Sequence, residues 1–458
     1  MFTPDDTIVA VATPPGRGGV GVVRISGPGA VAIAGRLLDR VEDLKPRYAT
    51  LARILDHGQG PTPSGIDQVI ATFFPLPGSY TGEDVVELSA HGSPVLLERI
   101  IGLCLALGAR LAEPGEFTLR AFLNGRLDLV QAEAVADLVN AVTPLQARVA
   151  FDQLEGTITK LIAEVERELF DLIARLEASL DFPEEGYHFI ESGEVARVVK
   201  AVLNKANSLL SGAATGRLIR DGCQVVILGK PNVGKSTIFN RLVGSGRAIV
   251  APEAGTTRDL VTEVISLDGF ALTLVDTAGL RSAQGIVEAE GVSRARQAVG
   301  VAAAAVVVLD RSHALEPEDL AVLKETALTP RVVVLNKVDR PRLWSSESLP
   351  LGHQTVSVAM SALTGDGLDS LREKLREVLV GTDKLRDTPM VANTRHIGLL
   401  EQAAAALNGA LNAAEKLAAE EFVLADLERA RVALEELTGK RTPDDVLQHI
   451  FERFCIGK

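Results

Sequence analysis

The sequence predicts a multidomain protein with an α+β N-terminal domain, an all-α helical domain in two separated segments, and an α/β domain inserted between those segments. Three observations support this fold class. β-rich runs and turns fill the first 119 residues, apolar residues recur at helical spacing in two distant regions, and strands alternate with helices from about residue 222 to 380. A chain of 458 residues is also too long for one compact core.

The composition indicates a soluble, cytoplasmic protein. Hydrophobic residues make up 47% of the chain and charged residues 23%, and no apolar run is long and uninterrupted enough to cross a bilayer. The segment Met1–Thr7 has neither a basic stretch followed by an apolar one nor the arginine-rich pattern of a transit peptide. We therefore expect no membrane role.

The cysteines and the net charge limit the possible chemistry. Cys104, Cys223 and Cys455 lie far apart and form no C-x-x-C pair, so we expect neither a disulfide framework nor a zinc site, in a reducing compartment. The formal net charge of −13 repels phosphodiester backbones. If RNA is a substrate, local basic patches or a partner must hold it.

Short strands and one helix are predicted in the N-terminal domain. β-branched residues recur between turns such as Pro14-Pro15-Gly16, as is typical of strands. A helix is expected from Pro94 to Leu107, ending before Gly108, which can adopt a left-handed cap conformation. The predicted strands are residues 8–12, 20–25 and 69–74.

Beyond Asn124-Gly125 the apolar period changes to alternating three- and four-residue steps. This period predicts a long amphipathic helix through Leu154–Leu180, with Thr143 and Pro144 as the cap and first-turn pair at its start. We expect the helices before and after the middle of the chain to pack together. Further helical tracts are predicted at 195–220 and 396–437, with Gly439 as the stop and Thr442-Pro443 opening a last helix.

Between the helical segments, short apolar runs alternate with helical stretches. This alternation predicts a largely parallel sheet that is covered by helices on both faces. The strand candidates are residues 225–228, 261–267, 271–275, 305–310, 331–335 and 355–359.

A phosphate-binding loop follows the first of these strands. Residues Gly229–Ser236 read Gly-Lys-Pro-Asn-Val-Gly-Lys-Ser and lie between a predicted strand and a predicted helix, the context that such a loop requires. Glycines let backbone N–H groups approach phosphates, and the helix N-terminus adds partial positive charge. Lys235 can reach the β- and γ-phosphates, and Ser236 can hold magnesium. The alternative is a glycine-rich turn of no function, which the strand–loop–helix context disfavours.

Three further motifs follow later strands in the same order. Asp276–Gly279 can hold magnesium through water and sense the γ-phosphate. Asn336–Asp339 places an aspartate where it can accept both N–H donors of a guanine edge, which adenine cannot supply. Ser361-Ala362 can close over the base, although this pair alone could be an ordinary turn. The base is therefore predicted to be guanine.

The loop Gly255–Asp259 offers a further magnesium ligand. A threonine there can complete the magnesium shell once the γ-phosphate is present, and we choose Thr257; a polar loop without a ligand is the alternative. Leu280 occupies the position where Ras-like proteins carry the glutamine that orients water. Arg258 and Arg281 lie nearby but could simply solvate their loops, so a metal ion could supply the missing charge.

Four segments outside these motifs resemble the bacterial tRNA-modification GTPases of the TrmE or MnmE family, and the resemblance spans essentially the whole chain. The first is Thr7–Gly27, which contains Pro14-Pro15-Gly16-Arg17-Gly18-Gly19. The other segments are Tyr80–Leu88 with the later His91-Gly92, Glu113–Leu129 running into Gln131-Ala132-Glu133-Ala134, and the terminal Phe454–Lys458. Related ribosome-assembly GTPases share the nucleotide motifs but not these flanks.

The resemblance implies a folate-binding, dimerising N-terminal domain, a helical domain in two segments and an inserted GTPase domain. By similarity, Arg24, Glu87, Arg126 and Lys458 match positions that bind 5-formyltetrahydrofolate, a one-carbon carrier. Taken without the resemblance, each would be a surface charge or a structural ion pair. The predicted domain boundaries are 1–120, 121–219, 220–382 and 383–458.

The family hydrolyses GTP when two GTPase domains meet in a potassium-dependent way. By similarity, potassium is bound by Asn232 and by backbone oxygens around Ala251, Glu253 and Thr256, and Glu288 orients the attacking water. Glu288 and Lys235 are thus the predicted catalytic residues, although Glu288 alone would be taken for a helix-surface acid. The predicted GTP contacts are Asn232, Val233, Gly234, Lys235, Ser236, Thr237, Ala251, Pro252, Glu253, Ala254, Gly255, Thr256, Thr257, Asp276, Thr277, Ala278, Gly279, Asn336, Lys337, Asp339, Ser361 and Ala362.

The resemblance further implies a homodimer that works with a flavin-containing partner of the GidA (MnmG) type on C5 of the wobble uridine of certain tRNAs. Two other hypotheses remain open at this point. One is a ribosome-assembly switch, although the chain has no recognisable RNA-binding module and a negative net charge. The other is a stand-alone folate-dependent transferase with a regulatory nucleotide domain. Cys455 is interpreted as structural or positional, because nothing in the sequence indicates a reactive thiolate.

Overall fold

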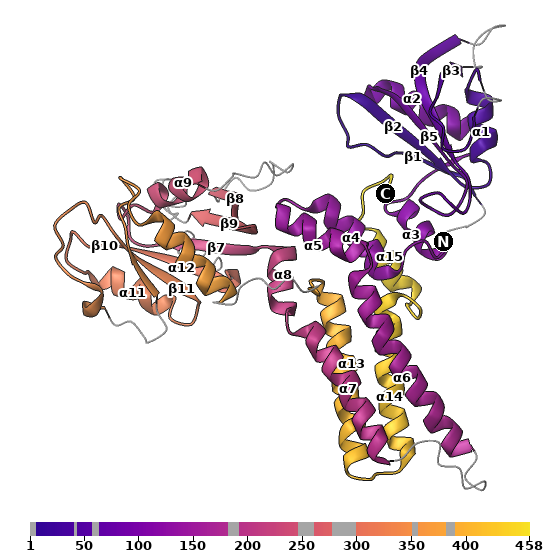
Figure 1. Cartoon of the computed structure of the whole chain (residues 1–458). Helices are drawn as coiled ribbons and strands as arrows, with labels where there is room; N and C mark the ends of the chain where they lie inside the picture. The colour runs from indigo at the N-terminus through magenta and orange to yellow at the C-terminus, as the bar shows by residue number, and fades with distance from the viewer. Residues whose placement is uncertain are drawn as a thin grey trace. The chain divides into compact units, whose positions relative to one another are not determined.

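The computed structural model divides into two compact units (Figure 1). The first unit comprises Met1–Ala136, Gln153–Val202 and Gln402–Lys458, and the second comprises Asp137–Asp152 and Leu203–Glu401. The predicted domain boundaries stay predictions. The structure describes residues 6–40, 44–56, 64–181, 192–245, 261–276, 299–349, 356–381 and 390–458.

A six-stranded sheet forms the N-terminal part of the first unit, and its order is β3-β4-β5-β2-β1-β6. Neighbouring strands are antiparallel except β1 and β6, which are parallel. Helices α1 (Ala30–Leu37) and α2 (Pro94–Ala106) contact both the sheet and each other, so they cover one face. The α+β prediction is confirmed. The strands are β1 (Ile8–Val11), β2 (Gly18–Ser26), β3 (Thr50–Asp56), β4 (Ser64–Phe74), β5 (Val85–Gly92) and β6 (Arg110–Leu111).

The helix predicted at residues 94–107 is α2, and Gly108 beyond it has a φ of 99°, as expected of a left-handed stop. The core between this sheet and its helices contains Val23, Ile25, Leu88 and Ile100, each with no exposed surface. The alternation of apolar and polar residues in β2 and β5 buries Val23, Ile25 and Leu88 on one face, and Ile100 of α2 packs against that face.

The C-terminal segment packs beside the N-terminal sheet in the same unit. Helix α15 (Asp444–Phe451) contacts α3 (Glu116–Leu123), and Ile456 pairs with Pro114 as an isolated antiparallel bridge. Gly457 has a φ of 95° and lies so close to the carbonyl of Val11 that a Cβ would collide with it. The last residues of the chain are therefore held against β1.

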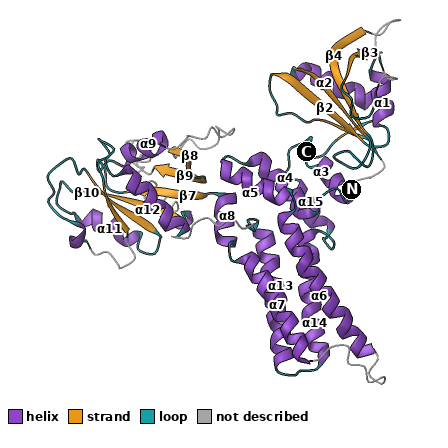
Figure 2. Ribbon diagram, viewed as in Figure 1, coloured by secondary structure: helices purple, strands orange, loops and turns teal. Residues whose placement is uncertain are grey.

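The remaining helices include four long ones, α6, α7, α13 and α14, of 19 to 25 residues (Figure 2). Helix α6 packs along α14, which confirms that segments from before and after the middle of the chain come together. The Glu166 carboxylate of α6 accepts a 2.6 Å bond from the Lys440 ammonium just beyond α14. The helices are α4 (Leu129–Asn140), α5 (Pro144–Leu154), α6 (Thr157–Asp181), α7 (Ser192–Leu210), α8 (Ala213–Asp221), α13 (Thr394–Glu415) and α14 (Glu420–Thr438).

Three predicted helices are each broken in two. The helix that starts at Thr143 stops after Leu154, because Gly156 turns the chain at a φ of 75° before α6 begins. The tract 396–437 is a pair of helices, and Leu417 has a φ of 54° in the turn between them. The tract 195–220 is divided at Ser211-Gly212. The cap prediction is confirmed, since the Thr143 hydroxyl accepts from the Gln146 N–H of α5.

The second unit contains a six-stranded sheet of order β12-β11-β10-β7-β9-β8, parallel except for β8. One apolar core includes residues of α9 and α12, and a second core on the opposite face includes Leu323 of α11, so both faces are covered as predicted. The elements are β7 (Cys223–Leu228), α9 (Lys235–Ser245), β8 (Val261–Leu267), β9 (Phe270–Asp276), β10 (Ala304–Asp310), α11 (Pro317–Glu325), β11 (Arg331–Asn336), the 3₁₀ turn η3 (Ser346–Ser348), β12 (Val356–Ala359) and α12 (Leu368–Val380).

Among the described residues, no helix is both long and apolar enough to cross a membrane.

Candidate functional site

The loop between β7 and α9 needs glycine at two positions. Gly229 has a φ of 148°, and a Cβ there would collide with the carbonyl oxygen of Val308. Gly234 has a φ of 102°, and a Cβ there would collide with the side-chain amide of Asn336. Both the backbone conformation and the close approach therefore exclude other residues.

Lys235 opens α9 and folds back over this loop. Its ammonium donates a 2.8 Å hydrogen bond to the carbonyl of Lys230, and its side chain is buried. The helix begins here because the Ile238 N–H donates to the Gly234 carbonyl at 3.0 Å. A cation and the N-terminus of a helix thus meet at this loop, an arrangement that binds phosphate.

Ser236 and Asp276 bring two oxygen atoms together. The Ser236 hydroxyl donates a 2.9 Å hydrogen bond to the carboxylate of Asp276, which is buried at the end of β9. Hydroxyl and carboxylate oxygens are the ligands that Mg²⁺ prefers, so this pair fits a magnesium ion beside the phosphate loop.

Asn336 links the phosphate loop to the loop that begins at Ser361. Its side-chain N–H donates to the Val233 carbonyl at 2.7 Å, and its side-chain oxygen accepts from the Ala362 N–H at 2.9 Å. We call this arrangement the Asn336 bridge. The asparagine is 1% exposed, so its amide has both ends satisfied within the protein.

Lys337 reaches across the phosphate loop in the same way. Its ammonium donates to the Asn232 carbonyl at 2.9 Å and pairs with the Asp310 carboxylate at 2.7 Å. Its backbone is left-handed, with a φ of 68°, which costs energy in a non-glycine residue and therefore needs such support. Asn232 is left-handed as well, with a φ of 63°.

Asp310 is a site residue that the sequence analysis placed only at a strand end. Burial alone would raise the pKa of its carboxyl, but hydrogen bonds from Lys337 and Ser312 lower that pKa to about 2. The carboxylate therefore stays charged and holds the lysine in place. The sequence indicates Asp310 only as an acidic residue at the carboxyl end of a predicted parallel strand. Ligands bind at this edge of a parallel sheet.

Asp339 faces Ser361 across the far end of the site. The Ser361 hydroxyl donates a 2.5 Å hydrogen bond to the Asp339 carboxylate and thereby lowers the pKa of that carboxyl. An ionised carboxylate can accept two N–H donors at once, as a guanine edge requires. The structure thus brings Lys235, Ser236 and Asp276 to one end of the sheet edge, and Lys337, Asp339 and Ser361 to the other.

Several predicted residues lie outside the described part of the chain, and their roles stay predictions. They include the proposed catalytic residue Glu288 and the magnesium ligand Thr257. Thr237 is described and lies exposed in the first turn of α9. The remaining predicted contacts outside the described residues are Ala251, Pro252, Glu253, Ala254, Gly255, Thr256, Thr277, Ala278 and Gly279.

Comparison with known proteins identifies the family. A family model described as the MnmE helical domain matches residues 129–455, and one described as the GTP-binding protein TrmE N-terminus matches residues 7–126. The chain belongs to the MnmE family of tRNA modification GTPases. It is 42% identical to the tRNA modification GTPase MnmE of Koribacter versatilis over 99% of both chains, and 43% identical to that of Azoarcus sp. over 99% of this chain and 98% of the relative. The protein is accordingly a GTPase, and the sequence-based family assignment is confirmed.

The four residues that match folate-binding positions of the family lie in the first unit, and two of them are in contact. The Arg24 guanidinium pairs with the Glu87 carboxylate at 2.8 Å and donates to the Gly457 carbonyl at 3.2 Å. Arg24 also lies over the Tyr80 and Phe117 rings, with 5.4 and 5.6 Å from Cζ to the ring centroids.

The other two matched residues lie on neighbouring segments. The Arg126 side chain lies beside Gly82, and a Cβ on that glycine would be 3.2 Å from the Arg126 Cγ. Lys458 follows Gly457 directly, and its N–H donates to the Cys455 carbonyl at 3.3 Å. Tyr80 and Phe117, which lie inside the motifs that carry the family resemblance, were not predicted as site residues; only the aromatic type within a motif could have indicated them.

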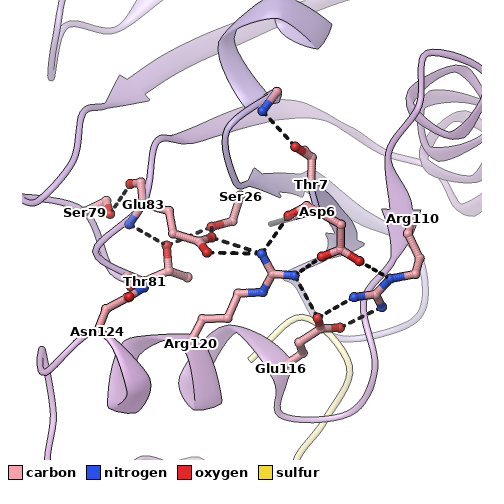
Figure 3. Close-up of polar contacts among 11 residues, drawn as sticks. Asp6, Thr7, Ser26, Ser79, Thr81, Glu83, Arg110, Glu116, Arg120 and Asn124 are labelled. Atoms are coloured by element: carbon pink, nitrogen blue, oxygen red, sulfur yellow. Dashed lines mark hydrogen bonds and ion pairs between the residues drawn. The ribbon is translucent and has the colours of Figure 1, made fainter. Parts of the chain in front are cut away.

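A buried charge network fixes the loop that carries Tyr80 (Figure 3). The Arg120 guanidinium, 5% exposed, contacts the carboxylates of Asp6, Glu83 and Glu116. Arg110 joins the network through a 2.7 Å ion pair with Glu116, whose side chain has no exposed surface. Charges at this depth are stable only when they are paired and hydrogen-bonded.

Glu83 is the member of this network that belongs to the loop itself. It accepts a 2.7 Å hydrogen bond from the Ser26 hydroxyl, and its backbone carbonyl accepts from the Ser79 hydroxyl at 2.5 Å. Asn124 donates to the Thr81 carbonyl at 2.8 Å (Figure 3). The loop from Ser79 to Glu83 is therefore held on both sides, which sets the position of the Tyr80 ring.

Glu116 should make this unit sensitive to acid. Burial alone would raise its pKa, but hydrogen bonds from Arg110, the Glu113 N–H and Arg120 hold the pKa below its usual value. The carboxylate therefore contributes stability above about pH 4.3, the usual value for glutamate, and this contribution is lost as pH falls through the lowered pKa.

We predict that Glu116→Gln lowers the free energy of unfolding by about 3 kcal/mol at neutral pH, because it removes one of the two carboxylates that Arg110 and Arg120 share, Asp6 being the other. The loss should shrink as the pH falls below about 4. Denaturant unfolding followed by circular dichroism across this pH range measures both effects. The exposed Glu113→Gln is the matched control, and a constant loss at every pH would contradict the account.

Proposed function

We propose that this GTPase takes part in C5 modification of the wobble uridine of certain tRNAs, as a homodimer that works with a flavin-containing partner of the GidA (MnmG) type. The modification is of the carboxymethylaminomethyl or aminomethyl type. The observation that carries the proposal is the membership of the whole chain in the MnmE family, together with the nucleotide site at the sheet edge. Movement of the GTPase domains on hydrolysis would regulate the modification step.

The phosphate end of the site would bind the triphosphate of GTP. Backbone N–H groups of the loop and the start of α9 face the phosphates, and Lys235 would exchange its bond to the Lys230 carbonyl for the β- and γ-phosphates. Ser236 and Asp276 would hold Mg²⁺, Asp276 through water. Magnesium, when bound, neutralises charge that develops on the phosphate oxygens.

The other end of the site would select guanine. Asp339 is ionised and would accept two N–H donors from the base, which adenine does not present. Lys337, held by Asp310 and by the phosphate loop, would lie over the ring. The Ser361 hydroxyl fixes the carboxylate, and the loop that begins at Ser361 would close over the base.

Potassium would take the place of an arginine finger in hydrolysis. Asn232 is exposed on the phosphate loop, and its side-chain amide oxygen is a suitable ligand for a hard cation. Ala251, Glu253 and Thr256 would supply the backbone oxygens, and Glu288 would orient the attacking water in place of the glutamine that Leu280 replaces. Dimerisation of the GTPase domains would complete this site.

The N-terminal unit would bind 5-formyltetrahydrofolate. The Arg24–Glu87 pair offers a cation for carboxylates and an acid for the pterin donors, and the Tyr80 and Phe117 rings border it, so these residues fit a flat heterocycle with a polar edge. Arg126 and Lys458 would add positive charge. The folate supplies the one-carbon unit when bound. Because the chain carries a net charge of −13, tRNA would be held by local basic patches or by the partner.

Potassium should stimulate GTP hydrolysis. We predict a steady-state rate about tenfold or more higher in potassium than in sodium buffer, because a cation at the developing charge stabilises the transition state. Asn232→Ala should lose the stimulation. Asn232→Gly, which tolerates a φ of 63°, should lose it too, whereas the exposed Asn240→Ala on α9 should keep it. Equal rates of the unmodified protein in both salts would contradict the potassium assignment.

Asp339→Asn should change the base that is recognised. An asparagine presents an N–H donor where xanthine has a carbonyl, so we predict an affinity for GDP lowered by about 100-fold and a gain for xanthosine diphosphate. Isothermal titration with both nucleotides measures the change. The exposed Asp369→Asn on α12 serves as control. Unaltered preference for GDP would remove Asp339 from the base site.

A further inference from the structure

Arg241 connects the helix that follows the phosphate loop with the loop predicted to close over the base. Its Nε donates to the Ala362 carbonyl at 3.2 Å, and a terminal nitrogen donates to the Leu363 carbonyl at 2.5 Å. A Cβ on Gly365 would lie 3.3 Å from the other terminal nitrogen, so the guanidinium fills the outer side of the turn. These contacts join α9 to a loop more than a hundred residues later.

The loop from Ser361 to Gly365 is held by polar contacts and by Ala362, which is buried in the apolar core. On its inner side, the Ala362 N–H donates to Asn336 and the Ser361 hydroxyl donates to Asp339. Its own turn is closed by the Gly365 N–H, which donates to the Ser361 carbonyl at 2.8 Å. Leu363 is 72% exposed, so this side chain gives the outer side little apolar anchoring. Arg241 supplies the tie on that outer side.

The position of Arg241 on α9 matters because Lys235 opens the same helix. A helix of 11 residues is rigid over this length, so the spacing between the phosphate lysine and the arginine is fixed. Through Arg241, the distance from the phosphate end to Ala362 is fixed as well. The Asn336 bridge makes the same connection from the inside, and the two ties lie on opposite sides of one short loop.

We propose that Arg241 is a positioning residue for guanine recognition: it holds the Ser361–Gly365 loop where Ala362 and Ser361 contact the base edge and the Asp339 carboxylate. The proposal rests on the proposed assignment of this loop to the base. Arg241 donates to loop carbonyls rather than to the nucleotide, so it acts on affinity through the loop. It takes no part in the choice between the 2-amino group of guanine and the 2-oxo group of xanthine, which belongs to Asp339.

Nucleotide dissociation tests this role. Fluorescently labelled GDP is displaced from the full-length protein by unlabelled GDP, and the release rate is compared among Arg241→Ala, Arg241→Lys and the unmodified chain. We expect release about tenfold faster from Arg241→Ala, since two charge-assisted hydrogen bonds are lost, and an intermediate rate from Arg241→Lys, which keeps a charged donor. The rate of hydrolysis at saturating GTP should stay within about twofold, because the phosphate contacts are intact.

Arg376→Ala on α12 is the matched control. This arginine belongs to the same unit, and its ion pair is with Asp268 at 3.9 Å, away from the base loop. Its release rate should equal that of the unmodified protein. The proposal would be overturned if Arg241→Ala released GDP at the rate of the unmodified protein. It would also be overturned if the hydrolysis rate at saturating GTP fell by the same factor as the release rate rose.

A second measurement separates this inference from the proposed base site. In the Asp339→Asn background, Arg241→Ala should accelerate release of xanthosine diphosphate by the same factor as it accelerates GDP release in the unmodified background. If Asp339→Asn fails to bind xanthosine diphosphate, the assigned base site is wrong. If it binds that nucleotide and Arg241→Ala has no effect on release, the base site stands and the role of Arg241 is wrong.

Discussion

A single buried amide connects the two halves of the nucleotide site. Asn336 donates to the phosphate loop at Val233 and accepts from the loop at Ala362. Because this amide is enclosed, any displacement of either loop would leave a polar group unpaired, which costs about 1–3 kcal/mol. Gly234 follows from the same constraint, since a side chain there would occupy the space of the Asn336 amide. Lys337, the next residue, is placed by the bridge and then secured by Asp310.

The first unit uses the same physical rule with charges instead of an amide. Arg120 and Glu116 are enclosed, and their partners Asp6 and Glu83 lie on segments that border Tyr80 and β1. Each buried charge requires its partners, so the loop beside the Arg24–Glu87 pair has one stable position. In both units, a buried polar cluster therefore positions the residues that are proposed to contact the ligand.

The parts of the fold that the sequence predicts best are those with a local signal. The strands of the second sheet are short apolar runs, and motif residues follow β7, β9, β11 and β12, so both the strands and the sheet edge are confirmed. Strands β3 and β5 and helix α1 were not predicted. The place of β5 in the sheet depends on pairing with the distant strand β2, which no local pattern indicates. The breaks at Gly156 and Leu417 were missed because apolar spacing continues through them. Contacts such as Asp310 with Lys337 depend on tertiary structure and leave only a weak sequence signal.

The measurement that tests this account most directly is the affinity of the Asn336→Ala protein for GDP, by isothermal titration. Removal of the amide leaves the Val233 carbonyl and the Ala362 N–H without a shared partner, so the account predicts an affinity at least about 30-fold weaker than that of the unmodified protein. The exposed Asn240→Ala should bind GDP normally. An affinity of Asn336→Ala within twofold of the unmodified protein would contradict the claim that the Asn336 bridge assembles the nucleotide site.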